Sequence, residues 1–431
     1  MWLPWLIFVS LVIPNFAASR KPEEVIYEWK YINFTWPSSE EYQDAIANRS
    51  YIKENNAISG IKIWNESIYL TIPRWKPGVP ATLVVAPVKP TNGKRFGSND
   101  TNESSSDSTQ VSPIPRSPYL EPYPNWPMQE IGDCSSLQSV LGMEIDPMGR
   151  MWILDTGRVN LLDSEPQNLC PPRLMILDLE QDGITLMEYE FPEEVANPNS
   201  SYLGDIVIDH EDGGFAYIAD GDDHAPGIIV FSLEAMTSWK IEHWSMMATS
   251  SKFTIDYDDT QVTRPMNLRS IALSPISEEG DRTFYYSPLS SLELFSISTS
   301  ALKDNSTGID EHVINLGKKS SQSSGMVMST NGRLIYGILT KNTVSMWNTK
   351  NNPIEDNEME LFHDDVQLQW PDSFAIDING TLWSVSNRFQ RFSSGSIDTS
   401  AVNFRVLKLG WMGNRNYQYY KNNTAPEWPI M

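Results

Sequence analysis

The chain has 431 residues, of which 40% are apolar and 11% are aromatic, enough for a large hydrophobic core. Its formal net charge is −23 at pH 7, and this acidity excludes the electrostatic attraction on which binding to nucleic acid or to anionic membranes depends. Neither is therefore expected as a partner. An acidic surface favours cationic small molecules or basic proteins, or it serves solubility alone.

The N-terminal residues Met1–Ser19 have the pattern of a secretory signal peptide. Trp2–Pro14 supplies the apolar segment, and Ala17–Ser19 places small residues where a signal peptidase cleaves. The apolar run is too short for a membrane-spanning helix, which needs ~20 residues. We expect a secreted, extracellular protein whose residues 20–431 form one domain.

The strands expected along the mature chain repeat one pattern. Each instance begins with a small or polar residue and an apolar-x-apolar strand, and a polar turn leads to a second apolar strand that holds an aromatic residue. Six instances occur in order: Gly60–Ile63 leading to Tyr69, Gly142–Ile145 to Trp152, Asp205–Ile208 to Tyr217, Ser270–Leu273 to Tyr285, Gly325–Met328 to Tyr336 and Ser373–Ile376 to Trp383. This recurrence predicts an all-β, six-bladed β-propeller; the alternative is a β-sandwich with chance spacing.

Two further segments are interpreted against this ring. A strand at Tyr27–Phe34 is expected to complete the last blade, because a terminal strand removes the exposed edge of a closed propeller. Residues from about Asn92 to Ser117 are rich in Ser, Asn, Asp and Pro and almost lack large apolar side chains. We expect a disordered insertion there and not a domain boundary, since the repeats continue on both sides.

The covalent features fit a secreted glycoprotein. The two cysteines, Cys134 and Cys170, most simply form one disulfide, which would stabilise the fold by about 3–4 kcal/mol in the chain-entropy model. Nine N-x-Ser/Thr sequons are candidate glycosylation sites: Asn33, Asn48, Asn65, Asn99, Asn102, Asn199, Asn305, Asn379 and Asn422.

No standard catalytic motif occurs, and the five histidines are scattered, so neither a cofactor nor a metal is expected. Geometry is the better guide, because inner strands of a propeller line a central channel. The residues expected to converge at one end of it are Asp205, Arg269, Ser270, Asp372 and Ser373, joined by Asp155, Asp220 and Asn387 where the second strands return. An Asp-rich rim with one arginine could hold calcium through oxygens, could hold an amine against a ring such as Phe389, or could only cap strand ends.

Four phrases together resemble the yellow/major royal jelly protein family: RWKPGVPATL at Arg74–Leu83, MWILDTG at Met151–Gly157, CPPRL at Cys170–Leu174 and SNRFQ at Ser386–Gln390. Their order and spacing match over roughly Ile58–Leu409. The resemblance implies a secreted six-bladed propeller. Members act in pigmentation and hardening of cuticle or eggshell, resemble dopachrome-converting enzymes, serve as nutritive or signalling proteins, or bind biogenic amines in saliva. The amine pocket of such members lies at one channel end, and Asn387 and Phe389 fit the contribution of the last blade, with Ser373 as a hydroxyl partner.

We therefore predict a secreted yellow-family glycoprotein of the catecholamine and melanin pathway that binds or converts dopachrome-type intermediates or biogenic amines at the channel. The ligand-binding set nominated is Asn387, Phe389, Ser373, Asp372, Arg269 and Asp205, with no catalytic residue nominated. Whether it is an enzyme stays open: a dopachrome tautomerase needs a general base, for which a rim carboxylate beside Arg269 is the candidate. The alternatives are a non-catalytic structural, nutritive or signalling protein and, more remotely, a calcium-dependent lactonase.

Overall fold

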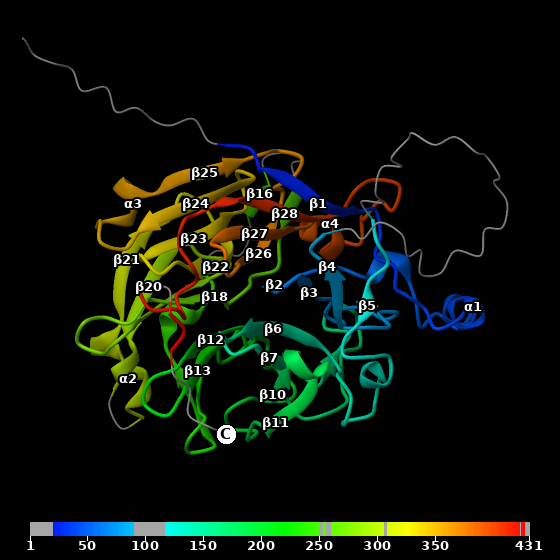
Figure 1. Ribbon diagram of the computed structural model, residues 1–431, viewed down its shortest axis with the longest axis horizontal. Helices are drawn as coiled ribbons and strands as arrows, with labels where there is room; N and C mark the ends of the chain where they lie inside the picture. Colours follow the sequence, from blue (N-terminus) through cyan, green and yellow to red (C-terminus); the bar gives the residue numbers. More distant parts are fainter. Residues whose placement is uncertain are drawn as a thin grey trace, which may run out of the picture.

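Six four-stranded antiparallel sheets surround a common axis in the computed structural model (Figure 1). The structure describes residues 20–89, 117–249, 253–255, 260–305, 308–422 and 424–426. The expected signal peptide, and the expected insertion apart from Ser117, lie outside the described residues. The innermost strands, one from each blade, are β2 (Ile61–Trp64), β6 (Val140–Ile145), β12 (Leu203–Asp209), β18 (Leu268–Leu273), β22 (Ser323–Met328) and β26 (Pro371–Ile376). Each contacts the next, and β26 contacts β2, so the ring is closed.

Three more strands extend each blade outward. The second strands are β3 (Ser67–Thr71), β7 (Arg150–Asp155), β13 (Phe215–Asp220), β19 (Thr283–Pro288), β23 (Arg333–Ile338) and β27 (Thr381–Ser386). The third strands are β4 (Leu83–Pro87), β10 (Arg173–Asp178), β14 (Gly227–Ser232), β20 (Glu293–Ser298), β24 (Thr343–Asn348) and β28 (Phe404–Trp411). The outermost strands are β5 (Glu121–Pro122), β11 (Ile184–Glu190), β15 (Thr237–Glu242), β21 (Ile314–Lys318), β25 (Met359–His363) and β1 (Glu24–Trp29).

Short elements decorate the blades. Two small ribbons pair β8 (Arg158–Val159) with β9 (Gln167–Asn168) and β16 (Phe253–Ile255) with β17 (Thr260–Val262). The α-helices are α1 (Ser39–Ala47), α2 (Thr299–Lys303), α3 (Ile354–Asn357) and α4 (Phe389–Ser393). Over the described part of the chain, no helix is both long and apolar enough to cross a membrane.

The predicted six-bladed β-propeller is confirmed. Every instance of the sequence repeat falls on the inner and second strand of one blade, and its aromatic residue lies in the second strand. The sandwich alternative is wrong, because six separate sheets stand around the axis where a sandwich has two layers. The apolar alternation of the repeat thus fills the space between neighbouring blades, which is where the core clusters lie.

The turn between the first two strands of a blade explains one part of the repeat. In the second blade, Asp146 accepts hydrogen bonds from the backbone N–H of Met148 and Arg150 and, at 3.0 Å, from the indole Nε1 of Trp152. Asp377 makes the same set of bonds in the sixth blade, where its indole partner is Trp383 at 2.9 Å. A single carboxylate therefore satisfies the turn amides and fixes the aromatic residue at the same time.

The N-terminal strand closes the ring, as expected. β1 pairs antiparallel with β28, from Glu24 opposite Lys408 to Trp29 opposite Phe404. The strand begins and ends earlier than the predicted Tyr27–Phe34. After Trp29 the chain leaves the sheet, and Phe34 is buried near the first blade, next to the backbone of Leu120. The apolar alternation of this segment thus serves two different packing surfaces.

The C-terminal segment binds at the end of the channel where the inner strands finish. The Thr330 N–H donates to the Arg415 carbonyl, and the buried Tyr417 hydroxyl accepts from the Ile208 N–H at 2.8 Å. Gln418 donates to the Ile145 carbonyl at 2.9 Å and also contacts His210. This segment therefore joins three blades across the channel and leaves the opposite end as the accessible one.

The described sequons differ in exposure. Of the sequon asparagines that the structure describes, six are exposed, as a glycan requires: Asn48, Asn65, Asn199, Asn305, Asn379 and Asn422. Asn33 is half-buried, and its Oδ1 accepts from Phe34 N–H and Trp36 Nε1. Asn99 and Asn102 lie outside the described residues. Glycosylation itself stays a prediction.

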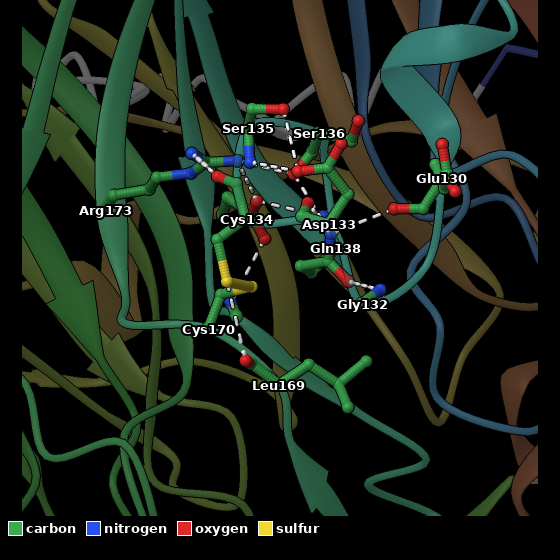
Figure 2. The surroundings of a disulfide bond; sticks show 12 residues. Glu130, Gly132, Asp133, Cys134, Ser135, Ser136, Gln138, Leu169, Cys170 and Arg173 are labelled. Atoms are coloured by element: carbon green, nitrogen blue, oxygen red, sulfur yellow. Dashed lines mark hydrogen bonds and ion pairs between the residues drawn. A yellow bond between two sulfur atoms is a disulfide. The ribbon is translucent and has the colours of Figure 1, made fainter.

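The predicted disulfide between Cys134 and Cys170 is confirmed, with Cα atoms 5.5 Å apart. It ties the segment before β6 to the segment before β10, and Figure 2 shows Arg173 pointing at the same backbone. The Arg173 guanidinium donates to the carbonyls of Cys134 and Ser136 and pairs with Asp155 at 3.2 Å. A covalent link and a buried ion pair thus hold the same corner of the second blade.

We predict that the double variant Cys134→Ser/Cys170→Ser unfolds at lower guanidinium chloride concentration. The bond closes a loop of sequence separation 36, for which the chain-entropy model gives a loss of about 3–4 kcal/mol. Wild-type protein measured with a reductant should match the variant. An unchanged midpoint in both would contradict a stabilising role for the bond.

Candidate functional site

The accessible end of the channel is shaped by β-bulges near the starts of the inner strands. In β18 the pairing with β19 skips Arg269, and in β26 the pairing with β27 skips Asp372. A bulged residue is left outside the ladder, and its side chain is redirected. The two bulges let Arg269 and Asp372, from non-adjacent blades, meet at 3.3 Å.

Asp372 is the centre of a buried polar cluster that joins four blades. Its carboxylate accepts hydrogen bonds from the hydroxyls of Ser59 at 2.8 Å and Ser324 at 2.7 Å, from Asn387 Nδ2 at 3.2 Å, from Trp370 Nε1 at 3.3 Å and from Arg269 Nη2 at 3.3 Å. Arg269 extends the cluster to the third blade by donating to the Tyr202 hydroxyl at 2.8 Å. A buried carboxylate with this many donors is fully satisfied, which favours a structural and positioning role for Asp372.

The channel beyond this pair is narrow. Its cavity of about 30 Å³ is lined by Asp205, Ser270, Ser373 and Lys62 among others. This volume has room for about one water molecule and is too small for an aromatic ligand. Burial raises the pKa of the Asp205 carboxyl to about 7, an effect that Lys62 partly opposes. Lys62 itself pairs with Glu144 at 3.0 Å.

A wider pocket of about 300 Å³ opens on the outer side of Arg269. Arg269 is the one described residue that lines both cavities. The wide pocket is walled by the aromatic side chains Trp75, Tyr202 and Phe389, the apolar side chains Leu161, Leu162, Val262 and Met266, and the charged side chains Arg158, Asp163, Asp223, Arg264 and Arg269. Its volume is at the lower end of the range for small-molecule sites, and its mixed lining is typical of them.

One arginine that does not touch the pocket holds its first wall. The buried Arg74 guanidinium donates to five carbonyl oxygens: those of Val79, Pro80, Gln129, Leu137 and Gln138. The carbonyl of Arg74 in turn accepts from the Asn160 N–H, and that of Trp75 accepts from the Leu162 N–H. The RWKPGVP phrase therefore positions both Trp75 and the loop that carries Leu161 and Leu162.

Phe389 lies next to Trp75 in the lining of the wide pocket and is held by its neighbours. Its ring centroid lies 5.2 Å from Trp75 and 5.1 Å from Trp370. Asn387, which is buried, accepts from the Phe389 N–H at 2.9 Å and donates to the Ile58 carbonyl at 2.8 Å. Asn387 is thus a positioning residue that fixes the start of α4; its side chain does not line the wide pocket.

The structure divides the six nominated residues between several places. Phe389 and Arg269 line the wide pocket, whereas Asp205, Ser373 and Asp372 line the narrow channel. Binding of a ligand by any of the six stays a prediction. The sequence interpretation missed Ser59, Ser324, Tyr202, Trp75 and Arg158. A signal was present for four of them: Ser59 and Ser324 stand immediately before a repeat start, Trp75 lies inside a quoted phrase and Arg158 directly follows one.

Asp155 and Asp220, also expected near this end, cap strand entries. Asp155 accepts from the backbone N–H groups of Gln138 and Ser139, and Asp220 accepts from the Tyr202 N–H at 2.7 Å. Each carboxylate also has a cation, Arg173 for Asp155 and Lys240, at 2.8 Å, for Asp220. Within the described residues, no group of three or more His, Cys, Asp and Glu side chains is placed to hold a metal ion.

We predict that Asp205 makes the folding stability depend on pH. Its folded pKa of about 7 lies above the ordinary 3.8, so its stabilising contribution is complete below about pH 4 and is lost as the pH rises through 7. Relative to Asp205→Asn, the wild type should lose at least about 1 kcal/mol between pH 4.5 and pH 8 in denaturant titrations. The control Asp44→Asn, on the exposed face of α1, should run parallel to the wild type. Parallel curves for Asp205→Asn would contradict the assignment.

We predict that Asn387→Ala lowers the unfolding free energy by about 2 kcal/mol or more, because the Ile58 carbonyl and the Asp372 carboxylate lose a buried donor. Asn387→Asp should be worse at neutral pH, since it places a second carboxylate against Asp372, and should recover as the pH falls. Thermal unfolding measures both, with the exposed Asn351→Ala as the matched control. A midpoint equal to that of the control would refute the positioning role.

Comparison with known proteins places the chain. The family model described as Major royal jelly protein matches residues 138–414. Protein yellow of Drosophila yakuba is 29% identical over 412 residues, covering 93% of this chain and 71% of that protein. Protein yellow of Drosophila melanogaster is also 29% identical, over 415 residues with the same coverage. Among solved structures, a streptogramin B lyase has a TM-score of 0.40 at 10% identity and covers 83% of this chain and 95% of its own, a likeness too distant to bear on activity.

The family model spans more than half of the chain, and the yellow proteins align with nearly all of it. Two of the four phrases that carried the resemblance, RWKPGVPATL and SNRFQ, contribute Trp75 and Phe389 to the wide pocket and Asn387 to the Asp372 cluster. The chain belongs to the yellow/major royal jelly protein family.

Proposed function

We propose that this protein binds a small aromatic compound of the catechol or indole type in the wide pocket at the open end of the propeller. The observation that carries the proposal is the pocket itself: about 300 Å³, with aromatic rings and guanidinium groups among the lining side chains. A single catechol or indole ring is apolar on its faces and polar at its edge, and this lining is complementary to both.

The setting we propose is pigment chemistry outside the cell. The relatives named yellow support a place in the catecholamine and melanin pathway. The disulfide and the exposed sequons support a secreted glycoprotein, because disulfides persist in oxidising compartments and N-glycans are added to secreted chains.

Binding is favoured over turnover by the state of the pocket's carboxylates. Asp223 pairs with Arg264 at 3.5 Å, and Asp163 is exposed at the rim and accepts from the Ser164 N–H at 2.6 Å. Neither lies in the desolvated setting that tunes a carboxylate to act as a base near neutral pH. Asp205 has a raised pKa but is in the narrow channel beyond Arg269.

We predict that 4-methylcatechol, a neutral catechol, binds saturably in isothermal calorimetry and that Phe389→Leu weakens it about tenfold, because the ring contact is lost while the apolar volume is largely kept. Trp244→Leu, which changes a tryptophan that is 63% exposed and outside the pocket, should bind like the wild type. Absence of binding to wild-type protein would favour the structural or nutritive role. Loss of L-dopachrome colour above the spontaneous rate would instead favour an enzyme.

A further inference from the structure

Two of the three arginines that line the wide pocket already have a counter-ion. Arg269 pairs with Asp372 on the channel side at 3.3 Å. Arg264 pairs with Asp223 at 3.5 Å, and both of these side chains are 52% exposed. Their charges are therefore compensated within the protein, one in a buried cluster and one at the surface.

Arg158 has no such partner. Arg158 is the first residue of the short strand β8, directly after Gly157, and it lines the wide pocket. Within the described residues its guanidinium makes no ion pair or hydrogen bond, and its Nε is buried without a hydrogen-bond acceptor. Burial lowers the pKa of Arg158, Asp223 and, less strongly, Asp222 oppose this effect, and Arg264 adds to it. A half-buried guanidinium in this state is incomplete until an acceptor from outside supplies the missing bonds.

The remaining carboxylate of the lining does not complete it. Asp163 is exposed, and Ser164 donates to it through both its N–H and its hydroxyl. Burial lowers the pKa of Lys76, and the negative charge of Asp163 opposes this effect. Asp163 therefore stabilises a different cation, Lys76. The lining as a whole carries three arginines against two aspartates, and the unmatched positive charge is Arg158.

From this imbalance we infer that the wide pocket selects an aromatic ligand that bears a carboxylate, with Arg158 as the group that binds the carboxylate. The inference rests on the proposed function, since it names the ligand class of the same pocket. A guanidinium presents a planar pair of N–H donors that matches a carboxylate, and such charge-assisted bonds are about twice as strong as neutral ones. The protonated amine of a biogenic amine would instead meet like charge.

The test compares three ligands that share one ring and differ in charge. Calorimetry at pH 7 is run with 3,4-dihydroxyphenylacetate, which is negative, with 4-methylcatechol, which is neutral, and with dopamine, which is positive. We expect the carboxylate to bind at least about tenfold more tightly than the neutral catechol, and dopamine to bind most weakly. This ranking is measured on the unmodified protein and does not depend on the folding of any variant.

Arg158→Gln then assigns the effect to one side chain. It should weaken binding of 3,4-dihydroxyphenylacetate about tenfold more than binding of 4-methylcatechol, so that the preference for the carboxylate is lost while the neutral ligand still binds and reports that the pocket is intact. The matched control is Arg333→Gln, an arginine at the start of β23, outside the pocket. It should alter neither affinity.

The outcomes separate the inference from the proposal beneath it. Equal affinity for all three catechols, or tighter binding of dopamine, overturns carboxylate selection and leaves aromatic binding in place. A variant Arg158→Gln that retains the preference overturns the assignment to Arg158. If none of the three binds, both the inference and the proposed function are overturned.

Discussion

The contact between Asp372 and Arg269 determines the shape of the open end of the propeller. A β-bulge leaves each residue outside the pairing of its own strand. Hydroxyl and amide groups from neighbouring blades then donate hydrogen bonds to the Asp372 carboxylate. Removing either partner would leave a buried charge unpaired, which is far more costly than the pair is stabilising. The same contact divides the axial space, because Arg269 has the narrow channel on one side and the wide pocket on the other.

The repeat made most of the fold predictable from the sequence. The inner and second strands are buried, and their apolar alternation stands out against polar turns. Apart from β1, the outermost strands were not predicted, since strands such as β11 and β15 lie partly in solvent and mix charged with apolar side chains. Their positions are set by the hydrogen-bonding edge of the third strand, which leaves little trace in side-chain pattern.

The candidate site was predictable only in part. The expectation that the inner strands start at one end of the ring correctly placed Arg269 and Asp372 near each other, but the two bulges that bring them into contact were not predicted. The wide pocket was not predictable in the same way. Its walls come from loops at Trp75, Leu161 and Met266 and from α4, and loop positions follow from particular contacts such as those of Arg74. Arg158 lacks an ion-pair partner among the described residues, and this depends on how the loops are placed in space, which no pattern in the chain encodes.

The overall charge and the pocket act at different ranges. A net charge of −23 repels anions over long distances, but salt screens surface charges beyond about 10 Å at 0.1 M. A half-buried guanidinium is screened much less than the surface. In the proposed function, ligand selection therefore depends on a few side chains inside the pocket, while the acidic exterior acts on the approach of macromolecules.

The pairing of β1 with β28 affects the order in which the propeller can fold during synthesis. β1 is made first, yet within the part of the chain that the structure describes its sheet partner is β28, the last strand in sequence order. While the ribosome is still producing the intervening blades, the first strand has no edge to join, and the ring stays open until nearly the whole polypeptide has emerged. The sixth blade is thus completed late, and a chain interrupted before β28 carries an unpaired first strand, an exposed edge at which chaperones or other unfinished chains can bind.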